Sequence, residues 1–188
     1  MGTKNISCFK KKRQETDGII IFEDEAAFRQ DPTIHRSWFR CGSRSYIPTY
    51  GQRNTQHVYG AISIHDARFS YHFADTCNSS THREFLEMLI RKFHPQRIFL
   101  VEDNAKYHKN PDMWFWFDAH RKEVEPWFLP PYSPEFNPME SLWGYTRREG
   151  THNHFFPNVD ELIDSIKTVF RSIQSHPRLI QNYLVPFQ

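Results

Sequence analysis

The chain has 188 residues, of which 38% are hydrophobic and 16% aromatic, and its formal net charge is +2. This length and apolar content suit one domain with a buried core and exclude global disorder. No apolar run reaches membrane-spanning length, and the three cysteines form no Cys-x-x-Cys pair, so neither a membrane protein nor a cysteine-based zinc knuckle or disulfide framework is supported. We therefore expect a cytoplasmic protein in a reducing compartment.

The first third of the chain predicts strands and one irregular excursion. Residues 1–17 are polar and predict a basic linker, which leaves 18–188 for the folded domain. The apolar, β-branched run at 18–22 is typical of a strand buried on both faces. The segment 29–53 combines Arg, Pro, Gly and Ser and predicts an irregular loop or hairpin. Two strands joined by a tight turn are then expected at 57–64 and 68–73.

The rest of the chain alternates between helices and strands. The capping-box pattern Thr81–Glu84 predicts a helix start, and residues 96–101 predict the next buried strand. Asn110 and Pro111 open a further helix. A strand at 124–129 contains Pro126, which favours the edge of a sheet.

A stiff, proline-rich loop at 129–134 leads into the C-terminal helices. Asn137 and Asn158 are the expected N-caps of two helices, and 177–185 is expected to add a short one. Three strands followed by alternating helices and strands predict an α/β fold with a mixed sheet.

Three acidic residues occupy positions typical of a metal site. Asp24 follows the apolar run 19–22, and Asp103 follows the apolar run 98–101. If the two strands are neighbours, the acids lie side by side in the crevice where α/β sheets bind ligands. Glu140 lies in the first turn of a predicted helix. Such carboxylates suit Mg²⁺ or Mn²⁺, and grouped together they would repel one another without a cation.

Each acid also has a purely structural interpretation. Asp24 could be a solvated or turn residue, and Asp103 could form an Asx-turn. Glu140 is at the N3 position of its helix, where a glutamate hydrogen-bonds back to the N-cap. Spacing alone does not decide between these roles and metal binding.

Basic residues before the first strand and within the excursion are candidate DNA contacts, because arginine grips phosphate and stacks on bases. Their charge alone favours an ordinary solvated surface. The candidates are Lys10, Lys11, Lys12, Arg13, Arg36, Arg40, Arg44 and Arg53.

The stretch LPPYSPEFNPMESLW at 129–143 resembles the signature of DDE transposases of the mariner superfamily, most closely their bacterial and archaeal insertion-sequence branch. The segments FEDEAAF at 22–28, VYGA at 58–61 and LVEDNAKYH at 100–108 resemble the other signatures and occur in the same order. The resemblance covers roughly residues 18–175, and its last motif is long and specific.

This resemblance implies a ribonuclease H-like fold with a central mixed five-stranded sheet flanked by helices. It implies a catalytic, metal-binding triad of Asp24, Asp103 and Glu140 that holds two Mg²⁺ or Mn²⁺ ions. It also implies cleavage of double-stranded DNA at transposon ends and joining of the 3′-hydroxyl to target DNA at TA sites, by a homodimer in the prokaryotic cytosol. The family carries helix-turn-helix domains ahead of its catalytic domain, and we expect these to be separate or missing here.

Two further residues are candidates for contacts near the triad. Asn104 is expected to hydrogen-bond close to the metal or to shape the turn, and His108 to contact a scissile phosphate or to steady the site. Two other functions remain open. One is a ribonuclease H-like nuclease that cuts without joining, and the other is a non-catalytic, DNA-binding or assembly relic of a transposase.

Overall fold

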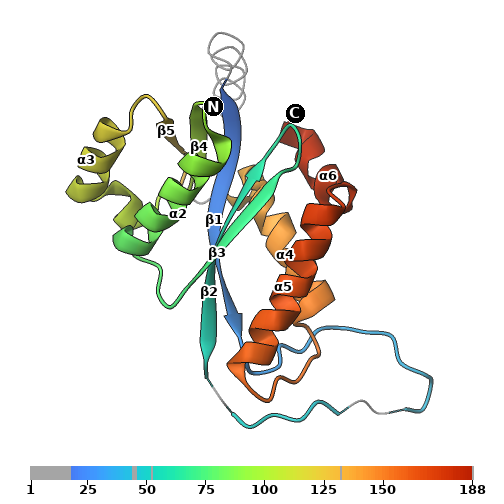
Figure 1. Cartoon of the computed structure of the whole chain (residues 1–188). Helices are drawn as coiled ribbons and strands as arrows, with labels where there is room; N and C mark the ends of the chain where they lie inside the picture. The colour runs from blue at the N-terminus through green and yellow to red at the C-terminus, as the bar shows by residue number, and fades with distance from the viewer. Residues whose placement is uncertain (1–17, 44–45, 52, 132, 188) are drawn as a thin grey trace.

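The computed structural model describes residues 18–43, 46–51, 53–131 and 133–187. A five-stranded sheet with the order β3-β2-β1-β4-β5 lies between two layers of helices (Figure 1). Its strands are β1 (Ile19–Arg29), β2 (Thr55–Ser63), β3 (Phe69–Ala74), β4 (Ile98–Glu102) and β5 (Val124–Phe128). This is the mixed five-stranded sheet expected from the sequence.

Strand β1 is the centre of the sheet. It pairs antiparallel with β2 from Ile21 to Arg29 and parallel with β4 from Ile19 to Phe22. The prediction that Asp24 follows the end of its strand is wrong, because the antiparallel partner β2 continues the strand to Arg29. The parallel pairing with β4 does stop two residues before Asp24, so the sheet opens there on the β4 side.

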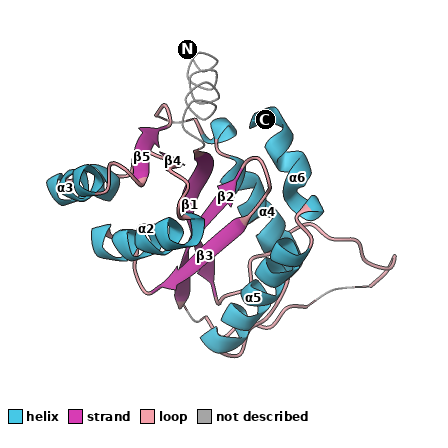
Figure 2. Ribbon diagram, turned by 45° about the horizontal axis from the view of Figure 1, so that its top comes forward, coloured by secondary structure: helices cyan, strands magenta, loops and turns pink. Residues whose placement is uncertain are grey.

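The two faces of the sheet carry separate cores, as the alternation of strand side chains requires (Figure 2). Ile20 and Phe22 of β1 face the layer of α4 (Pro138–Gly150), α5 (Val159–Ser175) and α6 (Arg178–Leu184). Ile19 and Ile21 face α2 (Ser79–Phe93) and α3 (Pro111–Ala119). Asp24 therefore lies on the α4 side of the sheet and its neighbour Glu23 on the α2 side.

Helices α2, α3, α4 and α5 start after asparagine caps. The predicted caps Asn110, Asn137 and Asn158 are confirmed for α3, α4 and α5. The predicted start of α2 is wrong: Asn78 is its N-cap and Thr81 is the N3 partner in the capping box, because Asn78 Oδ1 accepts from the Ser80 and Thr81 amides.

Shorter helical turns complete the described chain: η1 (Lys106–Lys109), η2 (Pro134–Phe136) and η3 (Val185–Phe187). Pro126 lies in β5, which is at the edge of the sheet as expected. None of the helices in the described ranges is long and apolar enough to cross a bilayer.

Residues 30–54 form a long connection between β1 and β2, here called the arm. Figure 1 shows it reaching away from the sheet beneath α5. Its base is tied to the loop after α4, because Gln30 Nε2 donates to the Phe156 carbonyl over 3.0 Å and the His35 amide donates to Asn153 Oδ1 over 2.9 Å. Farther out, Trp38 is fully exposed. The arm therefore has a fixed base and a large aromatic side chain in solvent.

Candidate active site

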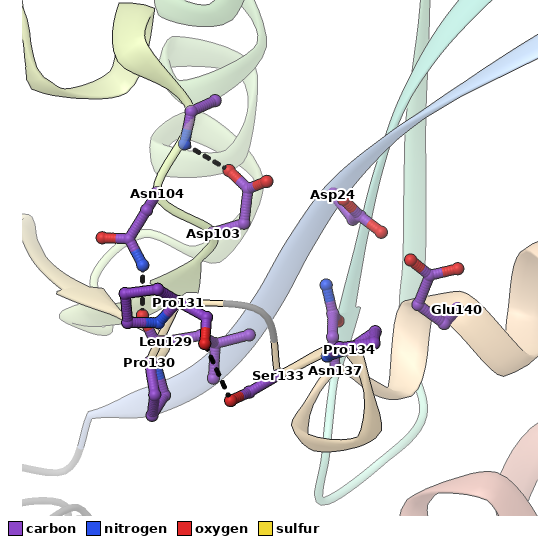
Figure 3. A pocket seen from close by; sticks show the side chains of 11 residues that line it. Asp24, Asp103, Asn104, Leu129, Pro130, Pro131, Ser133, Pro134, Asn137 and Glu140 are labelled. Carbon is purple, nitrogen blue, oxygen red and sulfur yellow. Dashed lines mark hydrogen bonds between the residues drawn. The ribbon is translucent and has the colours of Figure 1, made fainter.

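The three predicted acids line one pocket of about 470 Å³ on the α4 side of the sheet (Figure 3). Asp24 comes from the middle of β1, Asp103 from the loop after β4, and Glu140 from the first turn of α4. Figure 3 shows the carboxylates of Asp24 and Glu140 pointing toward each other, with Asp103 across the opening. The remaining lining residues are Asn104, Ala105, Leu129, Pro130, Pro131, Ser133, Pro134 and Asn137.

Asp24 is the least exposed of the three acids. Burial raises its pKa to about 7, and the nearby carboxylates of Glu25 and Glu140 add to the rise. Hydrogen bonds from the Glu25 amide and the Trp143 indole act in the opposite direction, the second over 3.2 Å to Asp24 Oδ2. A cation between the acids would remove this repulsion and hold Asp24 ionised. The donor set therefore fits a hard divalent metal ion.

Asp103 forms the Asx-turn that its sequence context suggested. Its Oδ1 accepts from the Ala105 amide over 2.7 Å and lies 3.3 Å from His108 Nδ1. The neighbouring His108 is the main cause that lowers the pKa of Asp103, and the Ala105 amide adds to it. Half of the side chain stays exposed. The turn and the metal role are therefore compatible, because the turn engages only one carboxylate oxygen.

Glu140 is exposed at the pocket rim. Asn137 caps α4, with its Oδ1 accepting from the Met139 amide over 3.1 Å. In the described part of the chain, the Glu140 side chain makes no reciprocal bond to the Asn137 backbone. No contact among the described residues therefore supports a capping role for Glu140, and the Glu140 carboxylate is available to a ligand in the pocket.

Asn104 connects two loops of the pocket. Its amide nitrogen donates to the Leu129 carbonyl, and its amide oxygen accepts from Lys109 Nζ. It thereby ties the loop after β4 to the start of the proline-rich loop that leads to Glu140. These contacts agree with the turn-shaping role, and a contact of Asn104 with phosphate remains a prediction.

His108 is fully buried and does not line the pocket. Its Nε2 lies 2.9 Å from Glu25 Oε1, and its Nδ1 faces Asp103. Glu25 also accepts a hydrogen bond from the Tyr107 hydroxyl. This position supports the interpretation that His108 steadies Asp103 from behind, whereas direct contact with phosphate would need the ring to be exposed.

The described basic candidates do not line the pocket of the triad. Arg36, Arg40 and Arg53 are exposed on the arm, and Arg53 lines a second pocket with Arg29 and Asp31. The remaining candidates fall outside the described residues, namely Lys10, Lys11, Lys12, Arg13 and Arg44.

Sequence reasoning missed two residues that shape the site. Trp143 lies one turn after Glu140 on the same helix face, a spacing that could have indicated it. Gly60 lies opposite Asp24 in the sheet, and a Cβ there would be 2.4 Å from Trp143 Cη2. The VYGA segment contains this glycine, but the sequence did not indicate why a glycine is needed there.

A family model described as DDE superfamily endonuclease matches residues 19–163, which is most of the chain. The chain belongs to this DDE endonuclease family. The match contains all three pocket acids, and the resemblance seen in the sequence is confirmed.

Two curated relatives are transposon proteins. An insertion element IS630 uncharacterized 39 kDa protein of Shigella sonnei is 23% identical over 159 residues, covering 84% of this chain and 46% of the relative. The transposable element Tc3 transposase of Caenorhabditis elegans is 25% identical over 163 residues, covering 82% and 49%. The DDE endonuclease chain thus spans about half the length of these relatives.

Solved structures of the Mos1 transposase share the fold. A Mos1 mariner paired end complex with Mn superposes with a TM-score of 0.67 at 14% identity, covering 98% of this chain and 57% of that one. A Mos1 catalytic domain with raltegravir and Mn gives 0.59 at 15% identity, covering 95% and 84%. The expected ribonuclease H-like fold of this DDE endonuclease is therefore confirmed.

Proposed function

We propose that this domain is the catalytic part of a transposase and that it cleaves and joins DNA with divalent metal ions held by Asp24, Asp103 and Glu140. The observation that carries the proposal is the convergence of these acids on one pocket from β1, the β4 loop and α4. The relative named as Tc3 transposase and the Mos1 complexes with Mn support it.

The protein's own part in the reaction is to position charge. Bound Mg²⁺ or Mn²⁺ ions, two in our proposal, would activate the attacking water or 3′-hydroxyl and neutralise the phosphate and the leaving oxygen. Asp24 lies on the rigid central strand beside Glu140, so these two acids form one side of the site. Asp103 forms the other side and stays ionised, because its pKa is lowered. No protein nucleophile is required, since phosphoryl transfer needs mainly orientation and charge stabilisation.

The substrate in this proposal is double-stranded DNA, first at the transposon ends and then at a TA target site. The arm, with Arg36 and Arg40 exposed, provides a surface for DNA or for a second subunit of a homodimer. Recognition of the transposon ends by helix-turn-helix contacts is a further part of this proposal, and the chain spans about half the length of its curated relatives.

A plasmid-nicking assay tests the cleavage step without knowledge of the terminal repeats. Supercoiled plasmid is incubated with the domain and Mn²⁺, and the open circular product is measured. Replacing Asp24 or Asp103 by Asn, or Glu140 by Gln, should reduce the nicking rate by about 10³-fold, as expected for loss of a principal charge-stabilising group. The matched control is Glu149→Gln, which makes the same change at an exposed position of the same helix.

A joining assay separates a transposase from a nuclease that only cuts. A pre-cleaved duplex with a free 3′-hydroxyl, ending in the sequence that borders the gene, is mixed with plasmid target and Mg²⁺. Covalent joining supports the proposal. Nicking without joining favours the nuclease, and neither product favours the non-catalytic relic.

A further inference from the structure

A second polar cluster lies on the opposite face of the sheet from the pocket. It consists of Glu23 from β1, His82 from α2, Glu102 from β4 and His108 from η1, and all four side chains are 0% exposed. One potential ligand atom from each residue lies within 4.8 Å of the other three. Two carboxylates and two imidazoles have thus been brought together inside the core by four different elements.

Most polar atoms of this cluster have no hydrogen-bond partner among the described residues, His108 Nε2 being the exception. Among the described residues, both carboxylate oxygens of Glu23, both of Glu102 and both ring nitrogens of His82 are buried without a hydrogen-bond partner. Burying a carboxylate in this state is strongly unfavourable unless a cation compensates it. Burial is the main cause that raises the pKa of Glu23, which reflects the same missing compensation.

The spacing of the atoms matches ligands around one ion. His82 Nε2 lies 3.3 Å from Glu102 Oε2 and 3.8 Å from Glu23 Oε2, and His108 Nδ1 lies 4.0 Å from Glu102 Oε2. Zinc binds nitrogen and carboxylate oxygen at about 2.0–2.2 Å in a tetrahedron, which places ligand atoms about 3.3–3.6 Å apart. A small contraction of the cluster would therefore create four zinc-ligand bonds.

The other nitrogen of His108 has the partner expected for a metal ligand. Its Nε2 lies 2.9 Å from Glu25 Oε1, so Nε2–H donates to a carboxylate, while Nδ1 lies between Asp103 Oδ1 at 3.3 Å and Glu102 Oε2 at 4.0 Å. Histidines that bind metals commonly donate their second nitrogen to a carboxylate, which fixes the tautomer and the ring orientation.

Carboxylates surround the two buried imidazoles. His82 lies next to Glu23 and Glu102, and His108 lies next to Glu25 and Asp103. Protonating both histidines would satisfy the charge only by placing two cationic rings 4.4 Å apart, centroid to centroid. One divalent ion neutralises both glutamates and leaves both imidazoles neutral.

We propose that Glu23, His82, Glu102 and His108 form a closed, structural site for one divalent transition metal ion, with Zn²⁺ the best match to two nitrogen and two oxygen ligands. Four protein ligands leave no open position, so this ion has no part in cleavage. It cross-links β1, β4, α2 and η1 directly behind Asp24 and Asp103, and its existence does not depend on the proposed function.

Metal content measured after refolding tests the site, since buried ligands take up metal as the chain folds. The protein is unfolded with guanidinium and a chelator, refolded with Zn²⁺, dialysed and analysed by mass spectrometry. We expect about one Zn²⁺ per chain in the wild type and in the Asp24→Asn/Glu140→Gln variant, and less than a tenth of that in Glu102→Gln. We also expect bound Zn²⁺ to raise the melting temperature of the wild type.

If Glu102→Gln does not fold, X-ray absorption at the zinc edge of the wild type tests the proposed site instead. Two imidazoles in the first coordination shell support the site. Zinc that disappears in the Asp24→Asn/Glu140→Gln variant, or a shell without histidine, assigns the metal to the pocket and overturns the proposal. Absence of bound zinc from the refolded wild type also overturns it, in favour of a protonated histidine cluster. None of these readouts involves DNA cleavage.

Discussion

The indole Nε1–H of Trp143 donates a hydrogen bond to Oδ2 of Asp24 over 3.2 Å. Trp143 lies one helical turn after Glu140, so α4 supplies one acid of the pocket and holds another in place. This bond couples the start of α4 to the centre of the sheet. It also opposes the rise in the pKa of Asp24 that burial causes.

Trp143→Phe removes this donor while keeping an aromatic ring in the core. Loss of a hydrogen bond to a charged group costs about 1.5–3 kcal/mol, so we expect the affinity of the pocket for Mg²⁺ at pH 7 to fall about tenfold or more. Isothermal titration calorimetry measures the change. Trp116→Phe, on the other side of the sheet, is the control and should bind Mg²⁺ as the wild type does. Equal affinity in Trp143→Phe would show that the bond is incidental.

Gly60→Ala tests why the residue opposite Asp24 in the sheet has no side chain. The new Cβ would lie 2.4 Å from Trp143 Cη2 and 2.7 Å from Met139 Cε, both in a packed core. We expect a loss of about 1–3 kcal/mol in the free energy of unfolding, measured with urea. Gly144→Ala is the matched control, because nothing lies within 4 Å of its Cβ on α4, and it should stabilise the protein by about 0.5–1 kcal/mol. Equal effects of the two substitutions would contradict the packing argument.

Metal binding in the pocket should depend on pH through Asp24. Its pKa of about 7 in the metal-free protein means that below pH 7 a proton must leave before a cation binds. The affinity for Mg²⁺ should therefore fall as the pH falls, by about tenfold per unit below pH 6, and should level off above pH 8. Asp103 does not contribute to the pH dependence of Mg²⁺ affinity in this range, because its pKa is lowered. Calorimetric titrations from pH 5.5 to 8.5 that give a constant affinity would contradict the assignment.

The arm should contribute phosphate contacts if it binds DNA. Replacing both Arg36 and Arg40 by Gln removes two exposed cations from it. The slope of log Kobs against log salt concentration should become shallower by about two, since each lost phosphate contact contributes about 0.9. Arg91→Gln/Arg171→Gln, on exposed faces of α2 and α5, is the control and should leave the slope unchanged. An unchanged slope in the arm variant would favour a role in subunit contact instead.

Much of the fold could be predicted because its signals are local. Apolar runs identified the buried strands, and asparagines followed by proline or acidic residues identified three of the four asparagine N-caps. The remaining cap was misplaced by three residues, because Thr81 and Glu84 have capping-box form while Asn78 is the residue whose side chain reaches the free amides. Local pattern allows both starts, and packing of α2 on the sheet selects one.

The candidate site, like the fold, could be predicted only in part from the sequence. Asp24, Asp103 and Glu140 could be named from motif order, yet the length of β1 could not, because its last residues are held by pairing with β2 rather than by their own apolar character. The proximity of Glu23, His82, Glu102 and His108 was not predicted, since β1 and α2 are far in sequence from each other and from β4 and η1. Only the register of β1 against β4 brings the two glutamates together behind the aspartates.

Anomalous diffraction from a crystal soaked in Mn²⁺ is the most direct test of the central claim that Asp24, Asp103 and Glu140 together hold divalent ions. We expect manganese peaks in the pocket, within coordinating distance of oxygens from all three carboxylates. A well-occupied crystal with no peak between Asp24 and Glu140, or with manganese only among Glu23, His82, Glu102 and His108, would contradict it.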